Sequence, residues 1–502
     1  MIQHLKRAQK YAKHIRELVV EDERIAPDAD SAQYGHVALP FLWNHSDHFN
    51  AGAKDPAERD RKLEQILDLI PINALRTFRS LDMRLAANQA NITALQLRLH
   101  ADYGNPSQLP AIFHREDGLK RLDVHIVDES LVTLLLDNIE NIGRNLQSLS
   151  LYGSSESGNF QLSSNPIKNH AWKGQRRTLP LKELRLTNWR LKDTYTSLSK
   201  IIDFHRLLKL DLAKCMDSFE FLSAMTNAKP DTKFHLRHVG LNDDFYREDA
   251  IELPRDGRNV CLKSLFQACP DISSLHIGAN QLSPLPPALK EYLASRGPEL
   301  RVLSLVSEHS VLHENDFDFV CKSCPNLEEL AARVDEEYFV AGMGYGNLEE
   351  FLDSIRRLQR LRTLHVQCPV VSDMFGSWSE RGGYARNDSQ ILATQMQTFA
   401  NLVYGEFFKN SHFNLEVLII GHLRPMLRDS MAYPAEIFSL DPGPRYLPQF
   451  CFIRSRQEDW LGRSTTTGVP VSRSLLRRTH LHVNILDVDC VEPFEQWVGQ
   501  AI

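Results

Sequence analysis

Apolar residues recur along this chain in short runs with the spacing apolar-x-x-apolar-x-apolar, and the runs follow one another at similar intervals. The clearest three come after Pro270, Pro298 and Pro325, which lie 28 and 27 residues apart. The last positions of each run alternate between apolar and polar side chains, which is the period of a half-buried strand. A repeated interval of this length indicates a repeat architecture, in which each unit buries its apolar face against its neighbours.

The same spacing recurs in copies that have no proline before them. In chain order these copies begin at Ile15, Ile92, Leu119, Leu146, Leu181, Leu207, Leu236, Leu361 and Leu415. Helical periodicity usually precedes a run, as in residues 130–142, 285–297 and 348–359. We therefore predict an α/β fold, a leucine-rich-repeat solenoid (horseshoe) with parallel strands on the concave side and helices on the convex side.

The intervals divide the chain into three parts. Residues 1–90 contain irregular repeats and a loop, residues 91–425 contain the repeat array, and residues 426–502 form an irregular segment and cap. Turn-forming residues are frequent in 426–470. We expect residues 481–498 to supply a final strand and the terminal cover that a solenoid needs.

Three long intervals place insertions at residues 153–180, 335–347 and 368–389, each directly after a predicted strand. Such connections emerge on one edge of a solenoid, where insertions often build a binding face. The insertions combine aromatic side chains with arginines, as interface hot spots do. We therefore take these as candidate partner-binding residues: Trp172, Arg176, Arg177, Tyr338, Phe339, Trp378, Arg381, Tyr384 and Arg386. The alternative is that the aromatic rings pack beneath their own loops.

Polar residues between the leucines of each run project away from the buried side. Repeat proteins use this surface for binding. The candidate contact residues on it are Tyr152, Arg185, His276 and His365. The simpler interpretation is that a strand face exposed to water must be polar.

Cys321 and Cys324 have the spacing of half a zinc knuckle, but their neighbours favour a different interpretation. Together with Phe317 and Val320 they fall on a single helical face. The helix before Pro270 repeats this spacing with Leu262, Leu265, Phe266 and Cys269. A zinc site would need two more ligands nearby. We therefore interpret both cysteines as small apolar core residues, and we interpret His480 and His482 as part of a polar strand face rather than a metal site.

Composition narrows the function classes. The 502 residues are 42% hydrophobic and 24% charged, with a net charge of −6, which gives no general attraction to nucleic acid or anionic membranes. No stretch approaches the roughly 18 apolar residues of a membrane helix, and the eight cysteines are sparse. We therefore expect an intracellular protein, cytoplasmic or nuclear, with no nucleic acid or membrane partner.

The usual phosphate-binding, zinc-protease and serine-hydrolase motifs are not found in the sequence. We therefore expect a protein that is not an enzyme and has no cofactor or metal. Two weaker alternatives are an enzyme with a site built from loops and a nucleic-acid binder that uses the basic clusters at 173–177 and 474–478.

The pattern C-P-x-L-x-x-L at 269–275 and 324–330 resembles the cysteine-containing class of leucine-rich repeat that is typical of F-box substrate receptors of cullin ubiquitin ligases. The irregular repeats and long insertions resemble fungal F-box/leucine-rich-repeat-like proteins. This resemblance implies a non-catalytic protein–protein interaction scaffold, the substrate-recognition part of a ubiquitin-ligase receptor. The alternative is a free-standing adaptor with no role in ubiquitination.

The F-box itself, which opens with Leu-Pro and continues as helices, is not evident in this sequence. Residues 39–45 begin with Leu-Pro, but no apolar helical run follows them. The resemblance implies protein partners, and it implies a Skp-type adaptor and a cullin if an F-box lies upstream.

Overall fold

The structure is a computed structural model of the chain. It describes residues 93–99, 119–126, 145–153, 178–213, 215–228, 232–242, 255–278, 284–306, 312–334, 348–367, 396–405, 414–421, 450–458 and 464–471, the short strands at 17–19 and 77–80, and single residues at 167, between 131 and 139 and between 475 and 485. The chain divides into two compact units, formed mainly by Trp43–Leu236 and by Arg237–Gln500.

The first unit contains a parallel sheet in which each strand pairs with the next one along the chain. Its strands are β1 (Glu17–Val19), β2 (Thr77–Ser80), β3 (Ala94–Leu99), β4 (Arg121–Ile126), β5 (Ser148–Gly153), β6 (Glu183–Thr187) and β7 (Lys209–Ala213). The connections after β6 and β7 contain α8 (Thr194–Leu198), the short 3-10 helix η5 (Phe204–Arg206) and α9 (Ser218–Asn227). The order of the strands is therefore the order of the repeats in the sequence.

The second unit continues this alternation and then changes direction. The strands β8 (His238–Asn242), β9 (Ser274–Gly278), β10 (Val302–Val306), β11 (Glu329–Arg333), β12 (Thr363–Gln367) and β13 (Val417–Ile420) are parallel. The last strands, β14 (Phe450–Glu458) and β15 (Ser464–Val471), pair antiparallel. The α/β class and the parallel strands are thus confirmed.

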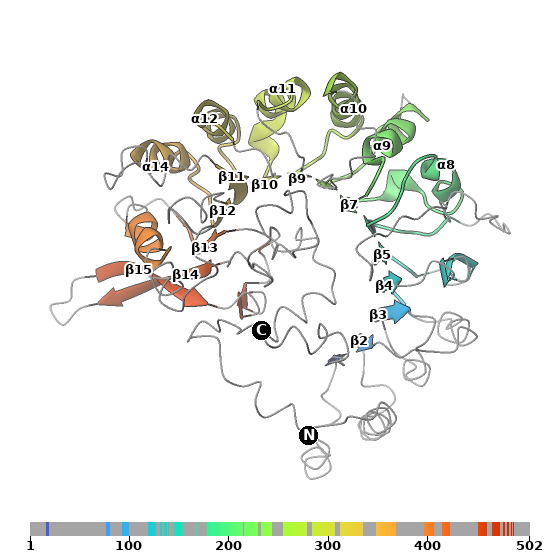
Figure 1. The fold of residues 1–502 in the computed structure, drawn as a ribbon, viewed down its shortest axis with the longest axis horizontal. Helices are drawn as coiled ribbons and strands as arrows, with labels where there is room; N and C mark the ends of the chain where they lie inside the picture. The colour runs from blue at the N-terminus through green and yellow to red at the C-terminus, as the bar shows by residue number, and fades with distance from the viewer. Residues whose placement is uncertain are drawn as a thin grey trace, which may run out of the picture. The chain divides into compact units, whose positions relative to one another are not determined.

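The helices of the second unit lie next to one another on the same face of its strands (Figure 1). They are α10 (Arg255–Ala268), α11 (Pro287–Arg296) with its 3-10 extension η6 (Gly297–Glu299), α12 (Glu314–Ser323), α14 (Leu348–Arg356) and a further helix over 396–405. Beneath them the apolar strand positions stand in register from strand to strand. One such row, formed by Leu275, Leu303, Leu330, Leu364 and Leu418, is buried.

Cysteine serves as a core residue at the ends of these helices, as the spacing predicted. Cys321 and Cys324 are completely buried, as are Phe317 and Val320. The Cys324 N–H donates to Val320 O at 3.0 Å as α12 ends, and Pro325 follows, where the helix does not continue. Burial raises the pKa of the Cys324 thiol to about 12, so the sulfur remains a neutral thiol.

Ion pairs hold neighbouring helices together on their outer side. The Asp318 carboxylate of α12 pairs with Lys322 in the next turn and with Arg357 at the end of α14, and it accepts a hydrogen bond from Ser354 Oγ. Burial alone would raise the pKa of Asp318, but the hydrogen bond from Lys322 and the charge of Arg357 outweigh burial and lower it. The anionic form of Asp318 therefore stabilises the contact between α12 and α14.

The turn-rich region 426–470, which we expected to be irregular, contains the hairpin of β14 and β15. The β15 segment STTTGVPV is rich in β-branched residues, and this favours a strand despite its glycine and proline. The predicted final strand at 481–498 differs from the structure at its described residues. Val483 and Ile485 lie outside strands, and the last described strand is β15.

Two side chains just beyond the strands of the first unit connect consecutive repeats. Trp189 follows β6, and its indole Nε1–H donates to Leu151 O at 2.9 Å. Cys215 follows β7, and its Sγ donates to Leu186 O at 3.2 Å. Each donor stands three positions after the last apolar residue of its run. Each donates to the carbonyl of the equivalent residue in the preceding repeat, which is the last apolar residue of that run.

Candidate functional site

The face of each sheet opposite the helices carries the polar strand positions, and we call it the helix-free face. In the first unit these positions form rows across four strands. The row nearest the strand starts is Arg121, Ser148, Glu183 and Lys209. The next row is Asp123, Ser150, Arg185 and Asp211. Charges of both signs therefore stand on adjacent strands at directly paired positions.

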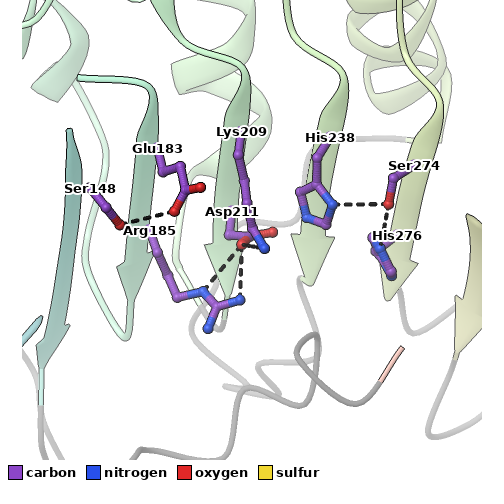
Figure 2. A network of polar contacts seen from close by, with 8 residues as sticks. All are labelled: Ser148, Glu183, Arg185, Lys209, Asp211, His238, Ser274 and His276. Atoms are coloured by element: carbon purple, nitrogen blue, oxygen red, sulfur yellow. Dashed lines mark hydrogen bonds and ion pairs between the residues drawn. The ribbon is translucent and has the colours of Figure 1, made fainter. Parts of the chain in front are cut away.

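We call the charged residues of these two rows the charged cluster. Its centre consists of Arg185, Asp211 and Lys209 (Figure 2). Asp211 Oδ2 accepts from Arg185 Nε at 3.2 Å and from Arg185 Nη2 at 3.0 Å, and Lys209 Nζ lies 3.6 Å away. The Asp211 side chain is only 7% exposed, whereas the Arg185 and Lys209 side chains are 22% and 26% exposed. The carboxylate thus anchors two cations whose outer atoms still reach solvent.

The edge of the cluster contains more exposed groups. Ser148 Oγ donates to Glu183 Oε2 at 3.0 Å (Figure 2), and the Glu183 residue is exposed. Arg121 Nε donates to Asp123 Oδ2 at 2.9 Å, and the Arg121 side chain is 55% exposed. The charge of Asp123 raises the pKa of Arg121, so the guanidinium keeps its charge.

Tyr152 lies on β5 beside Arg185, and it is buried rather than exposed. Burial raises the pKa of its hydroxyl, so the phenol is neutral. Of the two first-unit strand residues that we predicted to contact a partner, Arg185 therefore reaches the surface and Tyr152 does not.

The second unit has a cluster of two histidines and a serine on its first two strands, β8 and β9 (Figure 2). Ser274 Oγ lies 2.9 Å from His238 Nδ1 and 2.9 Å from His276 Nε2. The two imidazole centroids are 4.7 Å apart. The hydroxyl can donate to one ring and accept from the other, so this cluster links β8 to β9.

His276 is 1% exposed and His365 is completely buried. His365 Nε2 forms a hydrogen bond with Gly421 O at 2.7 Å and so connects β12 to the residue after β13. Gly421 has a φ of 104°, a conformation that glycine adopts readily and other residues rarely do. Both predicted contact histidines are therefore packed in this structure and cannot reach a partner without a rearrangement.

The remaining candidate residues belong to the insertions. Trp172, Arg176, Arg177, Tyr338, Phe339, Trp378, Arg381, Tyr384 and Arg386 lie outside the described residues. Their assignment to partner binding stays a prediction.

Sequence reasoning missed several residues of the two clusters, namely Ser148, Glu183, Lys209, His238 and Ser274. All five stand at the first position of a strand, and all except His238 stand two residues before a polar residue on the same face. The period of a strand, extended back by one step, would have found them.

The described residues contain neither a group of possible metal ligands nor a membrane-spanning helix. In the described parts of the chain, no three histidine, cysteine, aspartate or glutamate side chains lie close enough to hold a metal ion. Within the same residues, no helix is long and apolar enough to cross a bilayer.

The chain matches no protein-family profile and no curated protein in sequence. Among solved structures, it is similar to a chain in the crystal structure of the Rad7 and Elc1 complex in yeast. That similarity covers 73% of this chain and 83% of the other, with 14% identity and a TM-score of 0.39.

Proposed function

We propose that this protein is a non-catalytic protein-interaction scaffold built from leucine-rich repeats. The repeat consensus places an asparagine or a cysteine three positions after the last apolar strand residue. Trp189 and Cys215 stand at this position, and each donates to a carbonyl of the preceding repeat. These contacts, together with the register of the strands, support the assignment to this class of solenoid.

The observation that carries the function is the charged cluster on the helix-free face of the first unit. Arg185 and Lys209 share the buried Asp211 carboxylate, which restrains their side chains. Restrained cations lose little conformational entropy when a partner binds, so they suit recognition better than mobile ones. The exposed Glu183 beside Lys209 adds a group of opposite sign, which favours a partner surface of mixed charge.

The resemblance of the repeats supports a more specific proposal. The scaffold is the substrate-recognition part of an F-box/leucine-rich-repeat ubiquitin-ligase receptor, and it works with a Skp-type adaptor and a cullin. The alternative is a free-standing adaptor that binds its partner outside any ligase. Neither role requires a cofactor.

The test is affinity purification of the chain from its own cells, followed by mass spectrometry, for the wild type and two matched variants. Glu183→Ala with Lys209→Ala removes one charge of each sign and leaves the Arg185–Asp211 pair in place. Glu220→Ala with Lys200→Ala makes the same change at exposed positions outside the cluster. We expect the first variant to lose a reproducible partner by about tenfold and the second to keep it.

Each outcome of this experiment decides one part of the proposal. Capture that is equal for both variants would exclude the charged cluster as the contact, and no reproducible partner at all would refute the scaffold. Recovery of a Skp-type adaptor and a cullin would support the ligase receptor. A partner recovered without them would support the free-standing adaptor.

A further inference from the structure

The helix-free face of the second unit changes from polar to apolar along its rows. One row runs through His238, Ser274, Val302, Glu329, Thr363 and Val417. The neighbouring row runs through His276, Ser304, Ala331, His365, Ile419 and Cys451. Val302, Glu329 and Ala331 are at most 5% exposed although the helices lie on the opposite face. Another part of the chain therefore covers these strands.

The cover comes from residues between 475 and 485. Leu476 and Val483 are buried against Val417, Ile419 and Cys451 of β13 and β14. Ile485 is buried against Val302 of β10 and Ala331 of β11. The segment thus contacts β13 and β14 first and reaches β10 and β11 further along.

One polar contact fixes the end of this segment. The main-chain N–H of Ile485 donates to Glu329 Oε2 at 2.9 Å, and Glu329 is 3% exposed. A buried carboxylate needs such donors, because an unsatisfied one is costly. The donor here is a main-chain group, so a segment of any sequence can supply it.

The outer side of the segment remains in contact with solvent. Leu475 is 46% exposed and Thr479 is exposed, whereas the neighbouring Leu476 is completely buried. The segment therefore lies on the sheet as a bound peptide does, with apolar anchors on one side and solvent on the other.

We propose that the helix-free face of β10–β14 is a binding surface for a short apolar segment of another protein, and that the chain's own segment with Leu476, Val483 and Ile485 occupies it as a tethered competitor. The partner segment carries two aliphatic residues separated by one residue, as Val483 and Ile485 are, and gives the second main-chain N–H to Glu329. This proposal rests on the proposed scaffold function and adds the chemistry of a partner. A tethered competitor acts at an effective concentration of about the millimolar range, so a partner must displace it or bind after its release.

The test uses a fluorescent peptide of residues 474–489 and measures its anisotropy with the full chain. Ile485→Asp removes the anchor of the chain's own segment, and Leu475→Asp makes the same kind of change at an exposed position. We expect the peptide to bind the Ile485→Asp chain about tenfold or more tighter than the wild type and to bind the Leu475→Asp chain as weakly as the wild type. A peptide that carries Ile485→Asp should not bind.

The proposal is overturned if the Ile485→Asp chain keeps its native circular dichroism and does not gain affinity for the peptide. The segment would then be a fixed part of the fold. If this variant does not fold, a protease site inserted between Val471 and Leu475 of the full chain replaces it. After cleavage, exchange of the released segment for the labelled peptide supports the proposal, and retention without exchange refutes it.

The oligomeric state is a further readout that separates this proposal from an alternative. A wild-type dimer that becomes a monomer on Ile485→Asp would overturn it in favour of exchange between two copies of this chain. The peptide titration does not depend on partner capture by the charged cluster of the first unit. Failure of either experiment therefore leaves the other result interpretable.

Discussion

Gly297 at the end of α11 offers a sharp test of how closely the repeats pack. Its φ of −50° and ψ of −38° are helical, so an alanine fits the backbone there. A Cβ at this position would nevertheless lie 2.4 Å from Ser323 O and 2.9 Å from Cys324 Sγ. The residue therefore lacks a side chain because the next repeat leaves no room, and not because its backbone requires glycine.

Two opposing effects set the result of Gly297→Ala. Alanine restricts the unfolded chain more than glycine does, which stabilises a compatible site by about 0.4–1 kcal/mol. Overpacking costs about 1–3 kcal/mol. The atom that would be struck first is a main-chain oxygen at the end of α12, which cannot rotate away as a flexible side chain can. We therefore expect the steric cost to be larger, with a net loss of about 1–2 kcal/mol.

The assay is urea denaturation followed by far-ultraviolet circular dichroism, with Gly405→Ala as the control. Gly405 ends the helix over 396–405, and a Cβ there would meet no atom within 4 Å. The control should gain about 0.4–1 kcal/mol because only the unfolded-state effect remains. If Gly297→Ala is as stable as the control, the close approach between α11 and the end of α12 does not exist in solution.

Two further predictions concern charge and reactivity. Asp318→Asn should lower the free energy of unfolding at pH 7 by about 0.5–1 kcal/mol, because the carboxylate that pairs with Arg357 is lost. The pKa of Asp318 is lowered from 3.8, so its carboxylate stabilises the fold above this pH, and the contribution is lost as the pH falls through the lowered pKa. The difference in free energy of unfolding between variant and wild type should therefore shrink below pH 3.8. A difference that stays as large well below pH 3.8 as at pH 7 would refute this. Iodoacetamide should label the partly exposed Cys261 of the native chain much faster than the buried Cys324, as followed by peptide mass spectrometry, and equal rates would contradict the packing of α12.

The repeat spacing predicts the strands and their core residues because that information is local. Leu303 and Leu330 lie in register as their positions in the runs require, and Cys324 occupies a core position that an earlier helix fills in the same way. The spacing also shows which side of a strand faces the helices. It does not show what covers the other side.

The burial of the helix-free face depends on contacts between residues far apart in the sequence. Glu329 is separated by 156 residues from Ile485, whose N–H it accepts. No local pattern encodes such a contact. The sequence therefore predicted an exposed face, whereas the structure shows that residues far along the chain cover it. The hairpin of β14 and β15 was missed for a related reason, since turn-forming residues suggested irregular structure where β-branched residues were decisive.

The two units satisfy their buried carboxylates in different ways, and this difference bears on function. Asp211 accepts hydrogen bonds from Arg185 on the adjacent strand, so that part of the sheet needs no other segment to neutralise it. Glu329 accepts a hydrogen bond from Ile485, which lies on top of the sheet. Removing the segment takes one hydrogen-bond donor away from Glu329 and exposes the apolar side chains of Val302 and Val417. A face of this kind is stable only while a segment lies on it, whether that segment belongs to this chain or to a partner.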